Sequence, residues 1–267
     1  MKKIVIFLVT GLSVLFLAGC QSADDSDRDS AKDKEASAQQ VQKQTIAKNK
    51  TKWDAQVAKA KKIDVTSIGE TSSYVFPSSI KKFKEAKSLL IKGTVVNYEK
   101  LSYIHDDAYT KASIKIDKVL LGNQKKLEGK TVTLILHGGL TKSSDYLSDK
   151  NDLEYNGVSV NPHSDEELYI HDTDAPLPAI GSSIITDINY VEYDDQDSTA
   201  FANAMRLNKI KTKTVYRPRA EQFTLWVKDA GAKEYVLNNE NQRNNADPND
   251  LSSETAFTKE INDAYNK

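Results

Sequence analysis

The sequence contains a single cysteine, Cys20, and therefore has little scope for sulfur chemistry. A disulfide framework needs at least two cysteines and a cysteine-based zinc site needs several, so both are excluded. No second thiol is present to act as a catalytic nucleophile. We therefore expect the domain that follows Cys20 to be stabilised by its hydrophobic core alone.

Glycine-rich loops and long apolar runs are also missing after position 20. The 11 glycines are scattered, with one pair at Gly138-Gly139, so no loop of the phosphate-binding type occurs. No later apolar run approaches the roughly 20 residues that a membrane-spanning helix needs. The sequence also lacks a Gly-x-Ser-x-Gly elbow. It accordingly predicts a protein that is not an enzyme and has no cofactor.

An excess of positive charge is the third absence. The chain has 37 Lys and Arg residues against 38 Asp and Glu residues. Without Lys2 and Lys3, which belong to the export signal described next, the balance is 35 against 38, a formal charge of −3. Nucleic-acid partners favour a basic surface, so we expect none.

The first twenty residues resemble the export signal of a bacterial lipoprotein. A basic start at Lys2 and Lys3 precedes an apolar stretch, 4–17, that is too short to span a bilayer of about 30 Å. The stretch runs into Leu17-Ala18-Gly19-Cys20, which matches the lipobox motif. The resemblance implies cleavage between Gly19 and Cys20. It also implies a diacylglyceryl group on the Cys20 thiol, with acyl chains such as palmitate.

An ordinary secreted protein with a chance cysteine is the alternative interpretation of this segment. The position of the lone cysteine favours the lipoprotein. Two acyl chains anchor a protein firmly, since each buried CH₂ contributes about 0.8 kcal/mol. We therefore expect the mature protein on the extracytoplasmic face of the cell membrane, held there by the lipid on Cys20.

Polar residues follow the lipobox and give way to helical patterns. Residues 20–45 contain one Val41 and no aromatic residue, which predicts a disordered tether behind the lipidated cysteine. Residues 46–87 are assigned to N-terminal helices, the second of them near 79–87. A C-terminal helix, Ser252 to Tyr265, lies within 241–267. The stripe of the first helix consists of Ile46, Trp53, Val57 and Ala60.

Period-two alternation marks a β-rich domain between residues 88 and 240. The predicted strands cover residues 89–95, 111–116, 131–136, 184–193, 223–227 and 234–237. Because no helical pattern separates the first three strands, we expect them to be antiparallel. The fold class is therefore mainly β with flanking helices (α+β). Five or six antiparallel strands suit an OB-like barrel or a small sandwich.

The stretch from Ile80 to Val95 resembles the opening of a β-barrel domain that recurs in secreted and lipid-anchored proteins of Gram-positive bacteria. Ile116 to Gly122 is similar to the second strand of that domain, which usually ends in Val-Leu-Lys-Gly. Leu121 stands where lysine is usual. The resemblance covers residues 74–137 and implies a barrel, but it implies no activity or ligand for particular residues.

The segment 138–181 has no clear period and is long for a loop, so we interpret it as an insertion that is functional or mobile. A calcium loop is not supported, because Leu153 falls at the fifth position of a loop that begins at Asp149. His163 and His171 are eight apart, which does not fit a zinc helix. We therefore expect a solvated acidic loop without a metal. Its candidate ligand contacts are Asp165, Glu166 and His171.

Tyrosines at predicted strand ends are the other candidates for ligand contact. Exposed aromatic rings can stack on a sugar, a peptide or a partner surface. Plain packing is the competing explanation, since strands favour tyrosine. The candidates of this kind are Tyr98, Tyr103 and Tyr109, and Tyr190 and Tyr193 occupy similar positions.

These patterns favour a non-enzymatic binding or interaction module of the cell envelope, with an envelope protein, a peptide or a wall polymer as partner. A solute-binding receptor of an ABC importer is the first alternative. Lipidation and size fit it, but such receptors are built from alternating βα units. An envelope hydrolase is the second alternative, and it lacks a recognisable nucleophile or metal set.

Overall fold

The computed structural model describes residues 27–66, 78–86, 88–102, 107–147, 153–155, 158–194, 196–245 and 252–266. The chain divides into residues 1–41 and residues 42–267, which are described separately below. Gly19 and Cys20 lie outside the described residues, so cleavage and lipidation stay predictions. In the described part of the chain, no helix is both long and apolar enough to cross a membrane.

Helix α1 (Asp27–Val57) begins far earlier than the predicted start at Ile46. The expected disorder of residues 20–45 is therefore wrong from Asp27 onward. Lysine, alanine and glutamine dominate this segment, and these residues form helix without a tertiary partner when they are numerous. Side chains 36–41 are all exposed, so composition correctly indicated that this part has no apolar face to bury.

From Gln42 onward, α1 has a buried face. Trp53 is 7% exposed and its ring centroid lies 5.2 Å from that of Tyr98. Ile46, Val57 and Ala60 pack against the same core, which confirms the predicted helical stripe. This part of α1 therefore contributes apolar side chains to the interior of the barrel described next.

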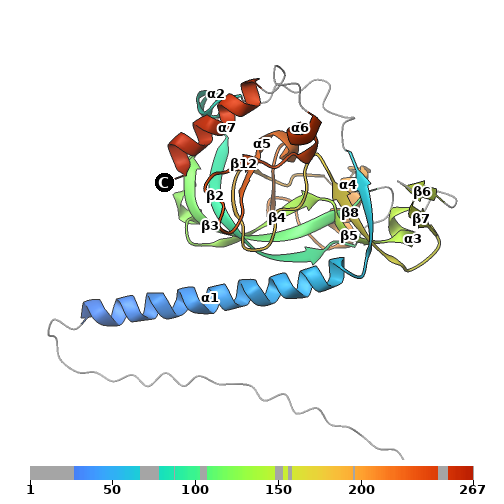
Figure 1. The fold of residues 1–267 in the computed structure, drawn as a ribbon, viewed down its shortest axis with the longest axis horizontal. Coiled ribbons are helices and arrows are strands. Elements are labelled where there is room, and N and C mark those ends of the chain that lie inside the picture. Colours follow the sequence, from blue (N-terminus) through green and yellow to red (C-terminus); the bar gives the residue numbers. More distant parts are fainter. Residues whose placement is uncertain are drawn as a thin grey trace, which may run out of the picture. The chain divides into compact units, whose positions relative to one another are not determined.

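Five strands form a closed barrel (Figure 1). They are β2 (Leu89–Lys100), β3 (Tyr109–Leu121), β4 (Thr131–His137), β9 (Ser183–Tyr190) and β10 (Tyr216–Arg217). The first three form an antiparallel meander and β9 returns to pair with β2, which is a Greek-key arrangement. β10 then pairs with both β9 and β4 and closes the ring. The predicted OB-like barrel is confirmed.

One barrel pairing differs from the predicted antiparallel pattern. Tyr216 of β10 pairs with Leu134 of β4 in parallel. A closed ring with an odd number of strands cannot alternate direction all the way round, so at least one pair must be parallel. The inward residues alternate with outward ones along each strand, as in Ala112, Ile114 and Ile116 of β3, which are all fully buried.

Gly93 lies where the long strand β2 bends between its two partners. The register between β2 and β3 shifts immediately before this residue. A Cβ at Gly93 would lie 2.7 Å from the carbonyl oxygen of Lys115. Only glycine therefore allows β2 to approach β3 this closely at the bend.

The predicted loop 138–181 contains regular structure, so its interpretation as an aperiodic solvated loop is wrong. Its elements are β5 (Gly139–Lys142), α3 (Ser143–Tyr146), β6 (Leu153–Tyr155), β7 (Val158–Val160) and β8 (Glu167–Asp172). Strand β1 (Lys61–Val65), from the segment predicted to be helical, pairs in parallel with β8 to give the sheet β1-β8-β5. This sheet has its own core, which includes Ile63, Leu168 and Ile170.

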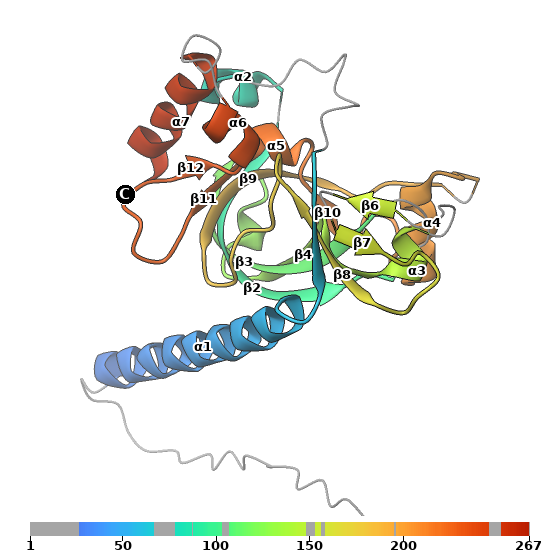
Figure 2. The same cartoon turned by 45° about the vertical axis from the view of Figure 1, so that its right-hand side comes forward.

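The remaining elements flank the barrel. They are α2 (Ile80–Glu85), the 3₁₀ turn η1 (Lys125–Leu127), α4 (Ala200–Leu207), α5 (Glu221–Thr224), β11 (Leu225–Lys228), β12 (Val236–Leu237), α6 (Glu240–Asn245) and α7 (Ser252–Tyr265). The predicted hairpin β11–β12 extends the sheet beyond β9, although the first residues of the predicted strand 223–227 belong to α5. Helices α2 and α7 lie side by side (Figures 1 and 2), with 5.7 Å between the ring centroids of Phe83 and Phe257.

Candidate functional site

The outer surface of β3 and β4 is the candidate ligand-binding surface of the barrel. In OB barrels the second and third strands, with the loops beside them, bind oligonucleotides and oligosaccharides. Here β3 and β4 are the second and third barrel strands. We call their outward surface the β3–β4 face. Its residues are Tyr109, Lys111, Ser113 and Lys115 of β3, which pair with His137, Ile135, Thr133 and Thr131 of β4.

Two connections frame one end of this face. One joins β2 to β3 through residues 101–108, and the other joins β9 to β10 through residues 191–215 and carries α4. Asn208 links them, because its Nδ2 donates to the carbonyl oxygen of Ser102 at 2.6 Å. Helix α4 covers Ile135 with apolar side chains that include Met205. The two connections therefore enclose the end of the face at which Tyr109 and His137 lie.

Aromatic rings and an arginine meet beside α4. The rings of Tyr109 and Phe201 lie edge to face, with 5.4 Å between their centroids. The Tyr109 ring has the same relation to His137 at 5.7 Å. The guanidinium carbon of Arg217 lies 4.7 Å from the centre of the Phe201 ring. We call these four residues the aromatic–arginine cluster.

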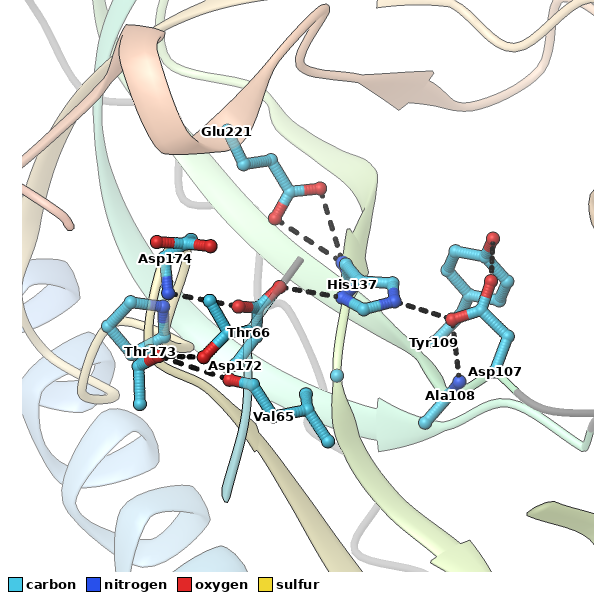
Figure 3. Close-up of polar contacts among 12 residues, drawn as sticks. Val65, Thr66, Asp107, Ala108, Tyr109, His137, Asp172, Thr173, Asp174 and Glu221 are labelled. Carbon is cyan, nitrogen blue, oxygen red and sulfur yellow. Dashed lines mark hydrogen bonds and ion pairs between the residues drawn. The ribbon is translucent and has the colours of Figure 1, made fainter. Parts of the chain in front are cut away.

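His137 is held between two carboxylates (Figure 3). Its Nε2 lies 2.5 Å from Asp107 Oδ1 and its Nδ1 lies 3.0 Å from Asp172 Oδ2. The same Asp107 side chain accepts a hydrogen bond from the Tyr109 hydroxyl at 2.5 Å. Asp172 is only 2% exposed and is fixed by the backbone N–H of Asp174, at 2.9 Å. A continuous hydrogen-bonded chain thus joins β8 to Tyr109 of the β3–β4 face.

Glu221 of α5 is the third carboxylate near the imidazole. Both of its oxygens accept from the backbone N–H of His137, at 3.2 and 3.3 Å. Burial raises the pKa of Glu221 to about 7, although the charge and the N–H of His137 act to lower it. This carboxyl group therefore titrates near neutral pH.

The imidazole of His137 is a cation at neutral pH. Burial lowers the pKa of His137, but the hydrogen bonds to Asp107 and Asp172 outweigh burial and raise the pKa to about 10. An imidazolium donates from both ring nitrogens, so neither nitrogen is available to bind a metal or accept a proton. Among the described residues, no group of His, Asp and Glu side chains is arranged to hold a metal ion.

The residues that were predicted from the sequence as ligand contacts do not lie together in the structure. Tyr109 lies on the β3–β4 face, and Tyr103 lies outside the described residues. Tyr98 is 6% exposed and donates to the carbonyl oxygen of Pro178, so its proposed role in binding is replaced by packing. Tyr190 is 40% exposed and its ring stacks on that of Tyr216.

The three candidates on the insertion form separate pairs. Lys142 binds Asp165 at 2.8 Å, and Lys61 binds Glu166 at 3.0 Å. His171 pairs with Glu240 at 3.1 Å. Successive residues of a strand point to opposite sides, so Asp172 of β8, and not His171, reaches His137.

Phe201 and Arg217 of the cluster were not predicted from the sequence. The same is true of the three carboxylates around His137, which are Asp107, Asp172 and Glu221. A signal existed for α4, since Thr199 is an N-cap whose side chain accepts from the backbone N–H of Ala202 at 3.3 Å. No local signal existed for Asp172 or Glu221, because they lie 35 and 84 positions from His137.

Comparison of the chain with protein-family models, curated protein sequences and solved structures found no match.

Proposed function

We propose that this protein is a lipid-anchored, non-enzymatic binding module of the cell envelope, and that it captures its partner on the β3–β4 face. One observation carries the proposal. The barrel has OB-like Greek-key order, and aromatic and charged side chains gather on the face where such barrels bind their ligands. The strand order is shared with OB barrels, and the side chains of the cluster supply the chemistry for binding a partner.

The cluster has the composition of a recognition surface. Tyrosine, phenylalanine and arginine are the side chains enriched where proteins bind partners. Tyr109 and Phe201 are partly buried, so their rings are held in place before a ligand arrives. A wall polymer, a peptide or an envelope protein are the partner classes compatible with an extracytoplasmic address.

Two alternatives receive less support from the fold. Importer receptors are built on parallel sheets of alternating βα units, whereas this chain has one closed barrel. An envelope hydrolase that uses His137 as its general base is not favoured, because Asp107 and Asp172 occupy both ring nitrogens of this imidazole.

Sedimentation with purified cell walls tests the binding proposal. The full-length protein, solubilised in a neutral detergent, should co-sediment with the walls. Phe201→Ala and Tyr109→Ala should each weaken retention about fivefold or more, because both remove aromatic contact area from the proposed binding surface. Asp165→Ala on the insertion serves as the control and should bind as the wild type does. Equal retention of all four proteins would contradict a binding role for the β3–β4 face.

Membrane fractionation tests the anchor separately. Cys20→Ala should abolish acylation and leave the precursor unprocessed or release the protein from the membrane fraction. Processing and membrane retention that match the wild type would exclude the lipid anchor. The result is independent of ligand binding, because fractionation measures processing and membrane retention and not capture of a partner.

A further inference from the structure

We infer that the partner of the β3–β4 face carries a carboxylate or phosphate group, and that Arg217 binds this group. The inference rests on the proposed binding function and adds the chemical class of the ligand. It concerns an anionic glycan or polyol polymer, whose sugar or carbon surface packs on the aromatic rings beside the arginine.

The position of Arg217 is fixed by the strand that carries it. It is the last residue of β10 and pairs with Asn189 of β9, while the preceding Tyr216 points into the barrel. Because side chains alternate along a strand, Arg217 points outward, toward the β3–β4 face. The residue is exposed.

The guanidinium of Arg217 contacts an aromatic ring and has no acceptor among the described residues. Its central carbon lies 4.7 Å from the centre of the Phe201 ring, so the cation is held beside an aromatic face. Within the described residues this guanidinium forms no hydrogen bond and no ion pair. An arginine held in this way presents a planar array of donors that matches a carboxylate or a phosphate in two-point contact.

The charges around Arg217 do not cancel its own. Arg219 is exposed two residues further along the chain, and its Nη2 donates to Asn189 Oδ1 at 3.1 Å. The protonated His137 offsets the charge of Asp107, which it contacts. The charge of Arg217 also acts on Glu221, but burial outweighs this effect and raises the pKa of Glu221 to about 7. At neutral pH a fraction of the Glu221 carboxyl groups is therefore uncharged.

The protein offers a separate surface to the apolar part of the ligand. Tyr109 and Phe201 are half-buried and lie beside Arg217, so a ring or a carbon chain that bears the anion packs on them. A neutral glycan satisfies the rings but leaves the arginine unpaired. A compact inorganic anion satisfies the arginine but not the rings. Glycans that bear uronic acids and polyols linked by phosphodiesters share the chemistry that satisfies both.

Calorimetric titration of the full-length protein in neutral detergent distinguishes these ligands. Three probes are compared: a neutral chitin oligosaccharide, an oligogalacturonate and an oligomer of glycerol phosphate. We expect binding of at least one anionic probe and at least about tenfold weaker binding of the neutral probe. The identity of the anionic probe that binds decides between carboxylate and phosphate.

Variants assign the contact to Arg217. R217Q should weaken the anionic probe at least about tenfold, and R217K should recover only part of the loss, because lysine can neither stack nor donate in a fork. The matched control is K259Q, which removes an exposed cation from α7. This helix carries no residue of the cluster, so the affinity should be unchanged. Raising salt from roughly 0.05 to 0.5 M should weaken the wild type more than R217Q.

Three outcomes would overturn the inference. They are binding of the neutral probe as tightly as the anionic ones, R217Q with wild-type affinity, and no binding of either anionic probe. The first leaves the proposed function standing, provided that Phe201→Ala still reduces sedimentation with walls. If wall sedimentation is also unaffected by Phe201→Ala and Tyr109→Ala, the proposed function fails as well.

Discussion

The side-chain amide of Asn262 forms two hydrogen bonds with the main chain of Tyr235. Its Nδ2 donates to the Tyr235 carbonyl oxygen at 2.9 Å, and its Oδ1 accepts from the Tyr235 N–H at 2.8 Å. A residue on a neighbouring antiparallel strand would satisfy the same two groups. Since Tyr235 directly precedes the edge strand β12, the C-terminal helix α7 satisfies backbone groups where the sheet ends.

Replacement of Asn262 by leucine should therefore destabilise the protein. The Tyr235 residue is 1% exposed, so the N–H and carbonyl groups that lose their partner gain little from water. We expect the free energy of unfolding to fall by about 1–3 kcal/mol. Urea denaturation followed by tryptophan fluorescence measures it, because Trp226 Nε1 bonds Thr258 of the same helix. N266A, which removes a bond to the Lys233 carbonyl and a bond from Lys228 Nζ, is the control. Equal losses in both variants would contradict a special role for Asn262.

His137→Gln should lower stability and flatten its dependence on pH above 6.5. The pKa of His137 is raised to about 10 in the folded protein. The protonated imidazole therefore adds stability below pH 6.5, and this contribution is lost as pH rises through 10. At pH 6 we expect a loss of about 3 kcal/mol, because the buried Asp172 is left without its cation.

Urea denaturation between pH 6 and pH 10 provides the measurement. The wild type should lose stability across this window, and the variant should lose less, because Glu221 still titrates near pH 7 in both proteins. His163→Gln is the matched control, since His163 is exposed. A wild-type slope in the His137→Gln variant would show that another group causes the pH dependence.

Glu221→Gln should remove a different part of the same profile. The pKa of Glu221 is raised from 4.5 to about 7, chiefly by burial. The protonated carboxyl is thus favoured in the folded state, and its contribution to stability is lost as pH rises from 4.5 through 7. The stability of the wild type should fall over this pH range, and the stability of the glutamine variant should fall less. The two profiles are compared by thermal unfolding at pH 4.5, 6 and 7.5. Parallel profiles would assign the slope to other carboxyl groups.

Local patterns in the sequence predicted the elements that local forces create. The helix Ser252–Tyr265 was predicted with the bounds that it has. Gly122 and Gly129 lie between β3 and β4, and both have positive φ angles, of 94° and 76°, which glycine adopts readily in turns. The alternation of β3 and β4 gave the barrel strands, because each strand has one face in the core.

The elements that depend on distant partners were not predictable in the same way. Strand β10 has only two residues, too few to show a period, yet it closes the barrel. Strand β1 pairs with β8 from a position more than a hundred residues earlier, as in Ile63 with Ile170. The His137 site combines side chains of β4, β8, α5 and the β2–β3 connection, and no spacing along the chain encodes that meeting.

In helix α1 a regular element was wrongly predicted to be disordered. The absence of apolar residues before Ile46 was interpreted as disorder, although it excludes only burial. Helix propensity is a separate property, and the lysines, alanines and glutamines of Asp27 to Thr45 are strong helix formers. Low hydrophobicity therefore predicted correctly that residues 36–41 are exposed, and wrongly that they have no regular structure.

The turn from β4 into the insertion depends on Gly139, and Gly139→Ala should be severely destabilising. The φ angle of Gly139 is +105°, and an added Cβ would lie 2.0 Å from Thr110 Oγ1. Thr110 is fully buried and donates to the carbonyl oxygen of Gly138 at 2.8 Å, so it cannot turn away without losing that bond. We expect the free energy of unfolding to fall by about 3 kcal/mol or more.

Gly129→Ala separates the clash from the strain of the backbone. The φ angle of Gly129 is also positive, at +76°, but nothing lies within 4 Å of an added Cβ. This control should lose about 1–2 kcal/mol from backbone strain alone. Thr110→Ala in the Gly139→Ala background should recover part of the larger loss, because it removes the atom that the new Cβ meets. If the two glycine variants are equally stable in urea, the close approach between Gly139 and Thr110 does not constrain the turn. The insertion, and with it Asp172, would then tolerate a looser attachment to the barrel.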